Sequence, residues 1–277
     1  EPIHMDNKLG ELKVSSLFGV EGRTVLVTGG ARGIGLAIAS GFLANGARVF
    51  IASRDAKACE ESASALSAAG PGSCEACPAD LATEAGCIRL AEQISERTQG
   101  SLNILINNSG TTWGEPFESY PEKAWDKVYA LNVKALFSLT RACLPMLRSG
   151  STAARPASVV NIGSVAGIVP QRFPTFAYDV SKAAVHHLTR KLAMEFADAG
   201  PDRPVTVNCI APGFVPSKMS HQLETYVPKE VLEGGIPMRR LGGATDMAGA
   251  ALFLASRAAS WMTGTVVVVD GGQISKL

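Results

Sequence analysis

Hydrophobic residues along the chain follow two spacings, one typical of buried strands and the other of amphipathic helices. Short apolar and β-branched runs predict strands at 23–28, 47–53, 73–79, 102–107, 157–163, 204–210 and 265–269. Helical spacing between these runs predicts helices at 34–45, 55–69, 83–98, 122–148, 177–198 and 245–256. Because strands that alternate with long helices are joined by βαβ crossovers, the pattern predicts a doubly wound α/β domain. Its sheet is mostly parallel, with helices on both faces.

Two segments interrupt this alternation. Residues 1–20 are mostly polar, and those ahead of the first Met are similar to a vector remnant, so we expect a tag remnant and an N-terminal extension. Residues 214–240 are punctuated by prolines and leave the carboxyl edge of the predicted sheet, which is typical of a lid or substrate loop. The remainder, with this loop, is predicted to form one domain over 21–277.

Composition and charge argue against several classes of protein. The chain has 277 residues, of which 46% are hydrophobic, enough for one substantial core. The net charge is +1 and no run is rich in Lys or Arg, which argues against a nucleic-acid surface. Apolar stretches fall short of the ~18 residues typical of a membrane span, and no signal-peptide pattern opens the chain. We therefore expect a cytoplasmic protein that acts on a small molecule.

Cysteines and histidines give little sign of metal chemistry. Only Cys74 and Cys77, among six cysteines, have the spacing of a ligand pair, and no second pair or histidine stands at a matching distance. We predict no metal and reduced thiols. His186 and His187 are adjacent on a predicted helix and must point in different directions, so we expect one packed and one solvated ring.

A tyrosine and a lysine four residues apart, Tyr178 and Lys182, share one face of a predicted helix. A free phenol has a pKa of about 10 and exchanges protons poorly at neutral pH. A neighbouring cation favours the phenolate and lowers that pKa, which would make the tyrosine a general acid or base. The same spacing also occurs by chance on helix surfaces, so its meaning depends on the surrounding motifs.

A glycine cluster follows the first predicted strand, in the sequence TGGARGIG from Thr28 to Gly35. Gly29, Gly33 and Gly35 stand where a turn needs positive φ, where backbone approaches a pyrophosphate and where a helix packs on a strand. The N-terminus of the following helix offers free N–H groups to phosphates. Taken alone, the cluster fits either a dinucleotide site or an ordinary tight turn.

Together these motifs resemble the short-chain dehydrogenase/reductase family. The matching features, in the family's order and spacing over roughly 22–273, are Thr28 to Gly35, the run NNSG at 107–110, Asn132, Ser164, Tyr178 with Lys182, and Pro212 with Gly213. The resemblance implies a Rossmann-type fold and a nicotinamide-dependent oxidoreductase. An idle NADP(H)-binding protein, or a dehydratase or epimerase on the same fold, is the alternative.

The resemblance also implies a catalytic set of Ser164, Tyr178, Lys182 and Asn132. Tyr178 would be the acid or base and Ser164 would polarise the carbonyl. Lys182 would lower the pKa of Tyr178 and hold the nicotinamide ribose, while Asn132 would hold a water that links the lysine to solvent. Two residues have plainer alternatives, because Ser164 could cap a strand end and Asn132 could be an interior amide bonded to backbone.

Further residues are implied as cofactor contacts. The full set is Gly29, Arg32, Gly33, Ile34, Gly35, Ser53, Arg54, Asp80, Leu81, Asn108, Gly110, Tyr178, Lys182, Pro212, Gly213, Val215 and Ser217. Asp80 would meet the adenine, although it could equally be a helix N-cap. Ser217 takes the place of the family's usual Thr and keeps its hydroxyl.

The end of the second predicted strand indicates which nicotinamide cofactor binds. NAD-specific proteins carry an acid there for the adenosine ribose, whereas this chain has Ser53 and Arg54, with Arg32 in the glycine turn. Two guanidinium groups can flank a 2′-phosphate, which favours NADP(H). The alternative is that Asp55 turns inward to the ribose.

The substrate is less defined by the sequence. Candidate pocket residues, mainly apolar, are Trp113, Val165, Phe173, Phe176, Phe214 and Met219. The phrases around them look most like 3-oxoacyl reductases of the rhamnolipid-synthesis type and also resemble gluconate and other polyol dehydrogenases. An apolar pocket favours an acyl or other hydrophobic ketone.

The last predicted strand, in TVVVVDGG at 265–272, predicts self-association. A bare edge strand of four valines invites aggregation, so natural folds cover it. The resemblance implies a homotetramer in which final strands and long central helices pack across two-fold axes.

Overall fold

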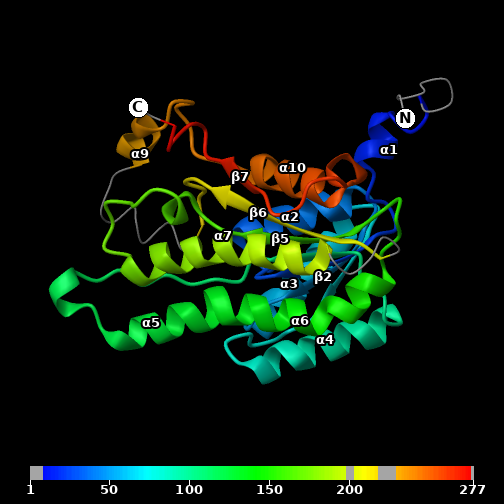
Figure 1. Cartoon of the computed structure of the whole chain (residues 1–277), viewed down its shortest axis with the longest axis horizontal. Coiled ribbons are helices and arrows are strands. Elements are labelled where there is room, and N and C mark those ends of the chain that lie inside the picture. The colour runs from blue at the N-terminus through cyan, green and yellow to red at the C-terminus, as the bar shows by residue number, and fades with distance from the viewer. Residues whose placement is uncertain (1–8, 198–202, 218–228, 276–277) are drawn as a thin grey trace.

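A computed structural model describes residues 9–197, 203–217 and 229–275 (Figure 1). Its single sheet has seven strands, all parallel to their neighbours, in the order β3-β2-β1-β4-β5-β6-β7. The strands are β1 (Thr24–Thr28), β2 (Arg48–Ala52), β3 (Ser73–Ala76), β4 (Ile104–Asn107), β5 (Ala157–Ile162), β6 (Val205–Pro212) and β7 (Val266–Val269). All seven strands predicted from the hydrophobic pattern are present, and the predicted doubly wound Rossmann-type fold is confirmed.

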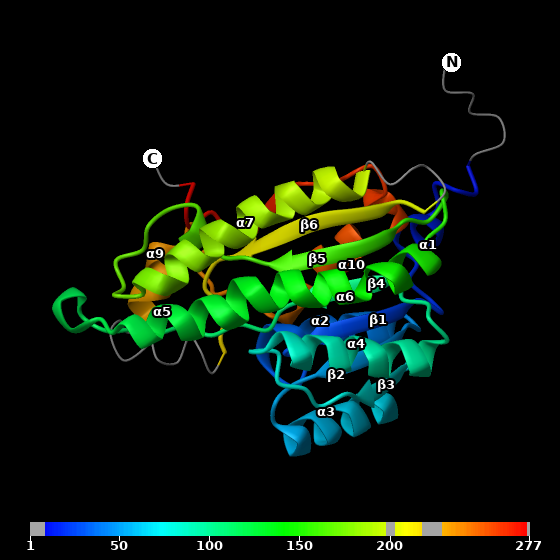
Figure 2. The same cartoon turned by 60° about the horizontal axis from the view of Figure 1, so that its bottom comes forward.

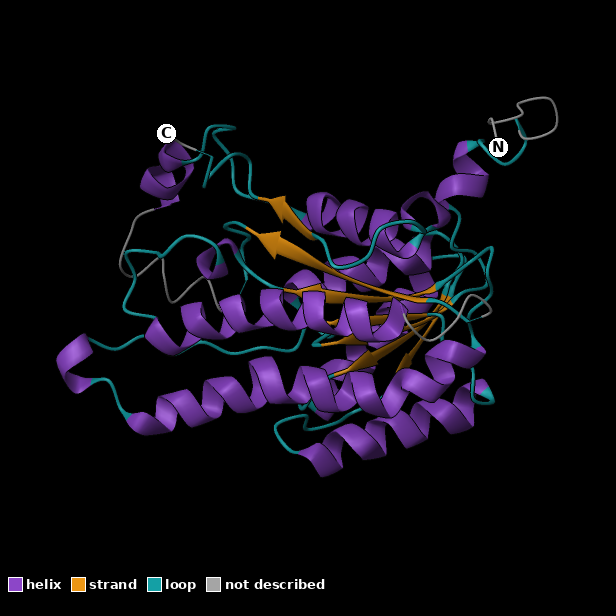
Figure 3. Ribbon diagram, viewed as in Figure 1, coloured by secondary structure: helices purple, strands orange, loops and turns teal. Residues whose placement is uncertain are grey.

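Helices cover both faces of the sheet (Figure 3). The long ones are α2 (Gly33–Ala44), α3 (Ala56–Ala69), α4 (Glu84–Thr98), α5 (Glu122–Tyr129), α6 (Ala135–Ser149), α7 (Phe176–Ala197) and α10 (Ala244–Ala255). Side chains from α4, α6 and α7 share one core cluster, and side chains from α2, α3 and α10 share the other. The central strands are therefore buried on both sides, which is why they read as continuous apolar runs. None of the described helices combines the length and apolarity needed to cross a bilayer.

Two helices lie outside the sequence prediction. The short helix α9 (Lys229–Gly235) falls inside the predicted substrate loop. Helix α1 (Val14–Phe18) falls in the N-terminal extension, and Figure 2 shows it beside the body of the domain. The Phe18 ring lies 6.3 Å from that of Phe253, so this part of the extension packs on the domain.

The predicted helix 122–148 is continuous but changes its winding. Between α5 and α6, residues Ala130–Lys134 form a π-helical turn, in which hydrogen bonds span five residues instead of four. Such turns are frequent at functional sites, and this one carries Asn132.

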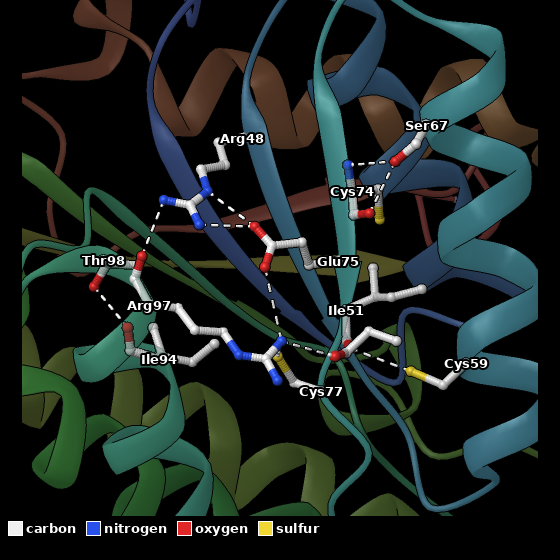
Figure 4. A network of polar contacts seen from close by, with 11 residues as sticks. Arg48, Ile51, Cys59, Ser67, Cys74, Glu75, Cys77, Ile94, Arg97 and Thr98 are labelled. Atoms are coloured by element: carbon white, nitrogen blue, oxygen red, sulfur yellow. Dashed lines mark hydrogen bonds and ion pairs between the residues drawn. The ribbon is translucent and has the colours of Figure 1, made fainter.

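A charged network ties β2, β3 and α4 together (Figure 4). Glu75 pairs with Arg48 at 2.7 Å and with Arg97 at 3.8 Å. The same view shows Cys74 and Cys77 apart, each with its own polar partner. They belong to the core clusters on opposite faces of the sheet, because side chains three residues apart along a strand point to opposite sides. Burial raises the pKa of both thiols, to about 12 and about 11, which makes them unreactive.

Candidate active site

A cleft of about 690 Å³ lies at the carboxyl edge of the sheet. Its walls are the segments that follow β1, β2, β4, β5 and β6, together with the first turns of α7. In parallel sheets all strand ends face the same way, so motifs far apart in sequence converge on one groove. The two ends of the cleft differ in composition. Guanidinium groups line one end, and hydroxyl, amine and aromatic groups line the other.

The glycine turn forms the floor of the cleft. Gly29 and Gly33 have φ of +62° and +55°, the left-handed region that other residues avoid. A Cβ on Gly35 would lie 2.2 Å from the Gly29 oxygen, so only glycine lets α2 approach the turn. The Asn108 side chain donates to the carbonyl oxygens of Thr28 and Gly29, at 2.9 and 3.2 Å. Its amide therefore braces the turn from the neighbouring strand.

Arg32, Ser53 and Arg54 line one end of the cleft. Among the described residues neither arginine makes an ion pair, so both positive charges are available to a ligand. Asp55 is not on the wall. Its carboxylate accepts the Ala58 N–H at 3.1 Å and caps α3, which argues against the alternative in which it turns to a ribose.

The two neighbouring residues predicted to contact the cofactor at this end, Asp80 and Leu81, differ in position. Leu81 is on the cleft wall, whereas Asp80 is not among the lining residues. The Asp80 carboxylate accepts the N–H of Ala82 at 3.1 Å, and the N-cap of α4 is Thr83. Asp80 thus shapes the loop that carries Leu81.

Ser164, Tyr178 and Lys182 meet at the other end. Ser164 follows β5, and the other two residues lie one turn apart on α7. The Lys182 ammonium is buried, donates to the Ile162 carbonyl at 2.7 Å, and lies 5.5 Å from the centre of the Tyr178 ring. Ser164 also accepts the Ala166 N–H at 3.1 Å, which leaves its hydroxyl proton to donate.

Burial controls the charges of this group. The pKa of Tyr178 is raised, first because burial disfavours the phenolate; Ser164 lowers it through a hydrogen bond, and Asp179 raises it. The net shift of the Tyr178 pKa is thus opposite to the expected direction, because burial outweighs the hydrogen bond from Ser164, and the separate effect of Lys182 stays a prediction. The same burial lowers the pKa of Lys182 to about 8. A tyrosine that stays protonated at neutral pH is suited to donate a proton, as ketone reduction requires.

Asn132 lies behind the cleft wall, in the π-helical turn. Its side chain accepts the Thr111 N–H at 2.8 Å and donates to the Thr111 carbonyl at 3.0 Å and to the Ser181 hydroxyl at 2.9 Å. These bonds match the plainer prediction of an interior amide bonded to backbone. They also fix the segment after β4 against α7, the helix of Tyr178. The role of Asn132 in holding a water stays a prediction.

The predicted substrate pocket is only partly assembled. Val165, Phe173 and Phe214 line the cleft, and the last two rings pack edge to face at 5.9 Å. Trp113 lies outside the lining and carries the ammonium groups of two lysines against its ring. Phe176 packs away from the cleft, against Phe117 and Tyr120. Met219 lies outside the described residues.

The remaining predicted contacts divide between cleft wall and scaffold. Those on the wall are Gly29, Gly33, Ile34, Asn108, Gly110, Pro212, Gly213, Val215 and Ser217. Gly35 supports the turn from behind.

Several polar wall residues escaped the sequence reasoning. Lys127 reaches the substrate end from α5, one turn before Leu131, which also lines the cleft. The available signal was the spacing of four residues between Lys127 and Leu131, the residue before Asn132, because residues at that spacing share one face of a helix. Gln273, near the C-terminus, accepts the Phe214 N–H at 3.2 Å and donates to the Gln171 side chain at 3.4 Å. No sequence motif marks that contact. The pocket is therefore more polar than predicted.

The fold and this cleft define a class of nicotinamide-dependent oxidoreductases, and the comparisons agree. A family profile described as Enoyl-(Acyl carrier protein) reductase matches residues 29–273. The chain belongs to the short-chain dehydrogenase/reductase family.

Particular relatives are closely similar over nearly the whole chain. The Rhamnolipids biosynthesis 3-oxoacyl-[acyl-carrier-protein] reductase of Pseudomonas aeruginosa is 48% identical, over 92% of this chain and 97% of the relative. A solved Pseudomonas aeruginosa RhlG/NADP active-site complex superposes with a TM-score of 0.87 at 47% identity, covering 93% of this chain and 98% of that one. A putative NAD(P) dependent gluconate 5-dehydrogenase from Beutenbergia cavernae gives 0.84 at 36% identity, covering 94% and 99%.

The buried charge of Lys182 predicts a distinctive pH dependence of stability. Its pKa is about 8 in the folded protein against 10.5 ordinarily, so the cost of burying the charge is complete below pH 8 and disappears towards pH 10.5. Relative to Lys182→Met, the parent should gain up to about 3 kcal/mol of unfolding free energy across this interval. Urea unfolding from pH 7 to 10 measures the difference. Lys57→Met, at an exposed position, is the control; a parallel pair of curves for parent and Lys182→Met would contradict the assignment.

Proposed function

We propose that the protein reduces a ketone to a secondary alcohol with NADPH, and that its substrates are 3-oxoacyl thioesters or similar hydrophobic ketones. The observation that carries the proposal is one continuous cleft with two differently built ends. Ser164, Tyr178 and Lys182 converge at one end, and Arg32 and Arg54 flank the other. The glycine turn after β1 lines the cleft between these ends, at the N-terminus of α2, where backbone N–H groups suit a phosphate.

The lining residues fit NADPH. Two guanidinium groups and the Ser53 hydroxyl suit a 2′-phosphate, and no acidic side chain among the described residues lines that end. The positive-φ glycines suit the pyrophosphate, and Lys182 is the group that would hold the nicotinamide ribose. When bound, the cofactor supplies a hydride. Two solved structural relatives are described as NADP complexes, which supports the same choice.

The chain's own residues supply hydrogen bonds and a proton. Hydride addition places negative charge on the carbonyl oxygen, so donors must stand ready where that charge develops. The Ser164 oxygen accepts the Ala166 N–H, and its hydroxyl proton, which hydrogen-bonds Tyr178 in this structure, can turn to the carbonyl oxygen of a substrate. Tyr178 keeps its proton at neutral pH and can transfer it to the same oxygen. The buried Lys182 charge then stabilises the phenolate left behind.

The substrate assignment depends on the other half of the cleft. The paired rings of Phe173 and Phe214 and the buried Val165 offer an apolar wall for an acyl chain. The name of the 48% identical relative supports a 3-oxoacyl substrate. Lys127 and Asp179 add charge to this wall, which keeps a gluconate-type polyol as the second candidate.

The proposal extends to assembly and location. β7 is the edge of the sheet, Val268 is 39% exposed and Trp261, just before it in sequence, is 99% exposed. A second apolar area lies on α4 and α6, where Ile88 and Phe137 are exposed. Two such areas suit a homotetramer with two kinds of two-fold interface. All six cysteines are free, which suits the reducing cytoplasm.

The reaction itself is tested by NADPH oxidation with a panel of ketones. We expect 3-oxoacyl thioesters to be reduced with higher kcat/KM than keto-gluconates, and turnover to increase with acyl length until the apolar wall is filled. Tyr178→Phe should lower kcat by about 10²–10⁴-fold while NADPH affinity and melting temperature stay unchanged, because only the proton donor is lost. Near-normal turnover by Tyr178→Phe would reject the proton path, and preference for keto-gluconates would favour the second candidate.

Cofactor choice is tested at Arg54. Loss of a charge-assisted contact typically costs about 1.5–3 kcal/mol, so Arg54→Asp should weaken NADPH binding roughly ten- to a hundredfold and leave NADH binding nearly unchanged. Arg89→Asp, an exposed arginine on α4 outside the cleft, is the matched control. Equal affinity of the parent for NADPH and NADH, measured by titration calorimetry, would refute the assignment.

Assembly is tested by light scattering. We expect a mass of about four chains for the parent, and a smaller assembly with a lower melting temperature for Val268→Asp, because a charge in a packed edge strand opposes pairing. Val231→Asp changes an exposed valine on α9 and serves as the control. A parent mass near 28.9 kDa, one chain, would exclude the oligomer.

A further inference from the structure

One buried titratable side chain near the cleft has no role in the proposed reaction. His186 lies one helical turn after Lys182 on α7 and is 4% exposed, whereas the adjacent His187 is exposed. The prediction of one packed and one solvated histidine is thus confirmed. Burying an imidazole is costly unless both ring nitrogens find partners, so the contacts of His186 indicate what holds it there.

Both partners belong to the segment that carries Ser164. The Ser164 N–H donates to Nε2 of His186 at 3.4 Å. The backbone of Gly167, at the other end of the short 3₁₀ turn Val165–Gly167 that Ser164 begins, faces the ring and acts to raise its pKa as a hydrogen-bonding group. One side chain therefore connects the two ends of the turn that presents the Ser164 hydroxyl to the cleft.

The chain leaves room for this ring at one position. A Cβ on Gly163 would lie 2.3 Å from Nε2 of His186, so glycine before Ser164 is what lets the imidazole reach the backbone. The same added atom would lie 2.8 Å from the Cys209 sulfur, so the ring and the sulfur together fill the space beside Gly163. The site is closely packed, and the ring has little freedom to turn.

The surroundings also keep the ring uncharged. The charged or titratable groups that face it are Lys182 and Arg190 on its own helix and Cys209 on β6. Burial, followed by the two cations, lowers the pKa of His186 to about 4. A neutral imidazole has one acceptor and one donor, which matches the Ser164 N–H and the Gly167 carbonyl. A protonated ring would have two donors and would lose the Ser164 contact.

We propose that His186 is a positioning residue for Ser164. Its ring accepts the Ser164 N–H at one end of the 3₁₀ turn and meets the Gly167 backbone at the other end. These contacts hold the Ser164 hydroxyl in place for the carbonyl oxygen of the substrate. The inference rests on the proposed reduction, because His186 affects the rate only if Ser164 takes part in that reaction. A hydroxyl displaced by about 1 Å can cost up to about a hundredfold in rate, so a residue with no contact to the substrate can matter.

The experiment combines kinetics with a double-mutant cycle. His186→Leu should lower kcat for ketone reduction about ten- to a hundredfold, with NADPH affinity within about twofold of the parent, as expected for a displaced donor. His186→Gln, which retains an acceptor and a donor, should recover most of the rate. His187→Leu, at the exposed neighbour, is the matched control and should retain parental kinetics. In a Ser164→Ala background, where the hydroxyl is absent, His186→Leu should reduce kcat by less than about threefold further.

A nuclear magnetic resonance measurement supplies a result that does not depend on turnover. In ¹⁵N-edited spectra at pH 7, the His186 ring, assigned by its loss in His186→Leu or His186→Gln, should be protonated at Nδ1 and unprotonated at Nε2. The amide proton of Ser164 should shift upfield in His186→Leu.

Either method can overturn the inference. Full kcat in His186→Leu, or an equal loss in the parental and Ser164→Ala backgrounds, would show that His186 acts only on general stability. A protonated Nε2 in the parent would remove the acceptor and reject the contact whatever the kinetics of the variants. A parent that reduces no ketone would reject the proposed function instead, and the spectra would still decide the His186 contact.

Discussion

Parallel pairing of all seven strands is the constraint on which the site depends. It directs every carboxyl end to one edge, so the glycine turn after β1, the NNSG run after β4, Ser164 after β5 and Gly213 after β6 meet without any sequence proximity. Parallel pairing also requires helical crossovers, and these bury the strands on both faces. The two core clusters on either side hold the edge rigid, and a rigid edge allows a few exposed side chains to keep a fixed geometry.

Burial then decides the charge of each group at that edge. Tyr178 is kept protonated, Lys182 has its pKa lowered to about 8, and His186 is kept neutral. All three effects have desolvation as their largest cause, so one environment favours a proton donor, a marginally stable cation and a neutral acceptor side by side. The cation is stabilised by the Ile162 carbonyl at 2.7 Å, and the same strand end leads directly to Ser164. Burying these polar groups lowers the stability of the fold, a cost that is common at functional sites.

Much of this could be predicted from the sequence because the signals were long or repeated. Every strand and every long helix followed from hydrophobic period, and Ser164, Tyr178 and Lys182 came from motifs that agree in order and spacing. The features that could not be predicted depend on three-dimensional surroundings. The direction of the Tyr178 pKa shift is set mainly by burial of the phenol against the hydrogen bond from Ser164, and spacing on a helix reports neither of them. The pocket was predicted as too apolar because Lys127 and Gln273 enter it from segments without a motif.

The contact of Gln273 gives the edge strand a second structural role. Gln273 stands just after β7, in a turn where the Asp270 carboxylate accepts the N–H groups of Gly272 and Ile274, both at 2.8 Å. That turn holds the Gln273 side chain against the Phe214 N–H and the Gln171 side chain, so the C-terminal segment closes one wall of the substrate half. The Gly213 N–H is meanwhile bound to the Val269 carbonyl at 3.0 Å. β7 therefore supports the cleft from both sides of one turn, because the strand binds the Gly213 backbone and the turn that follows it holds Gln273 against Phe214.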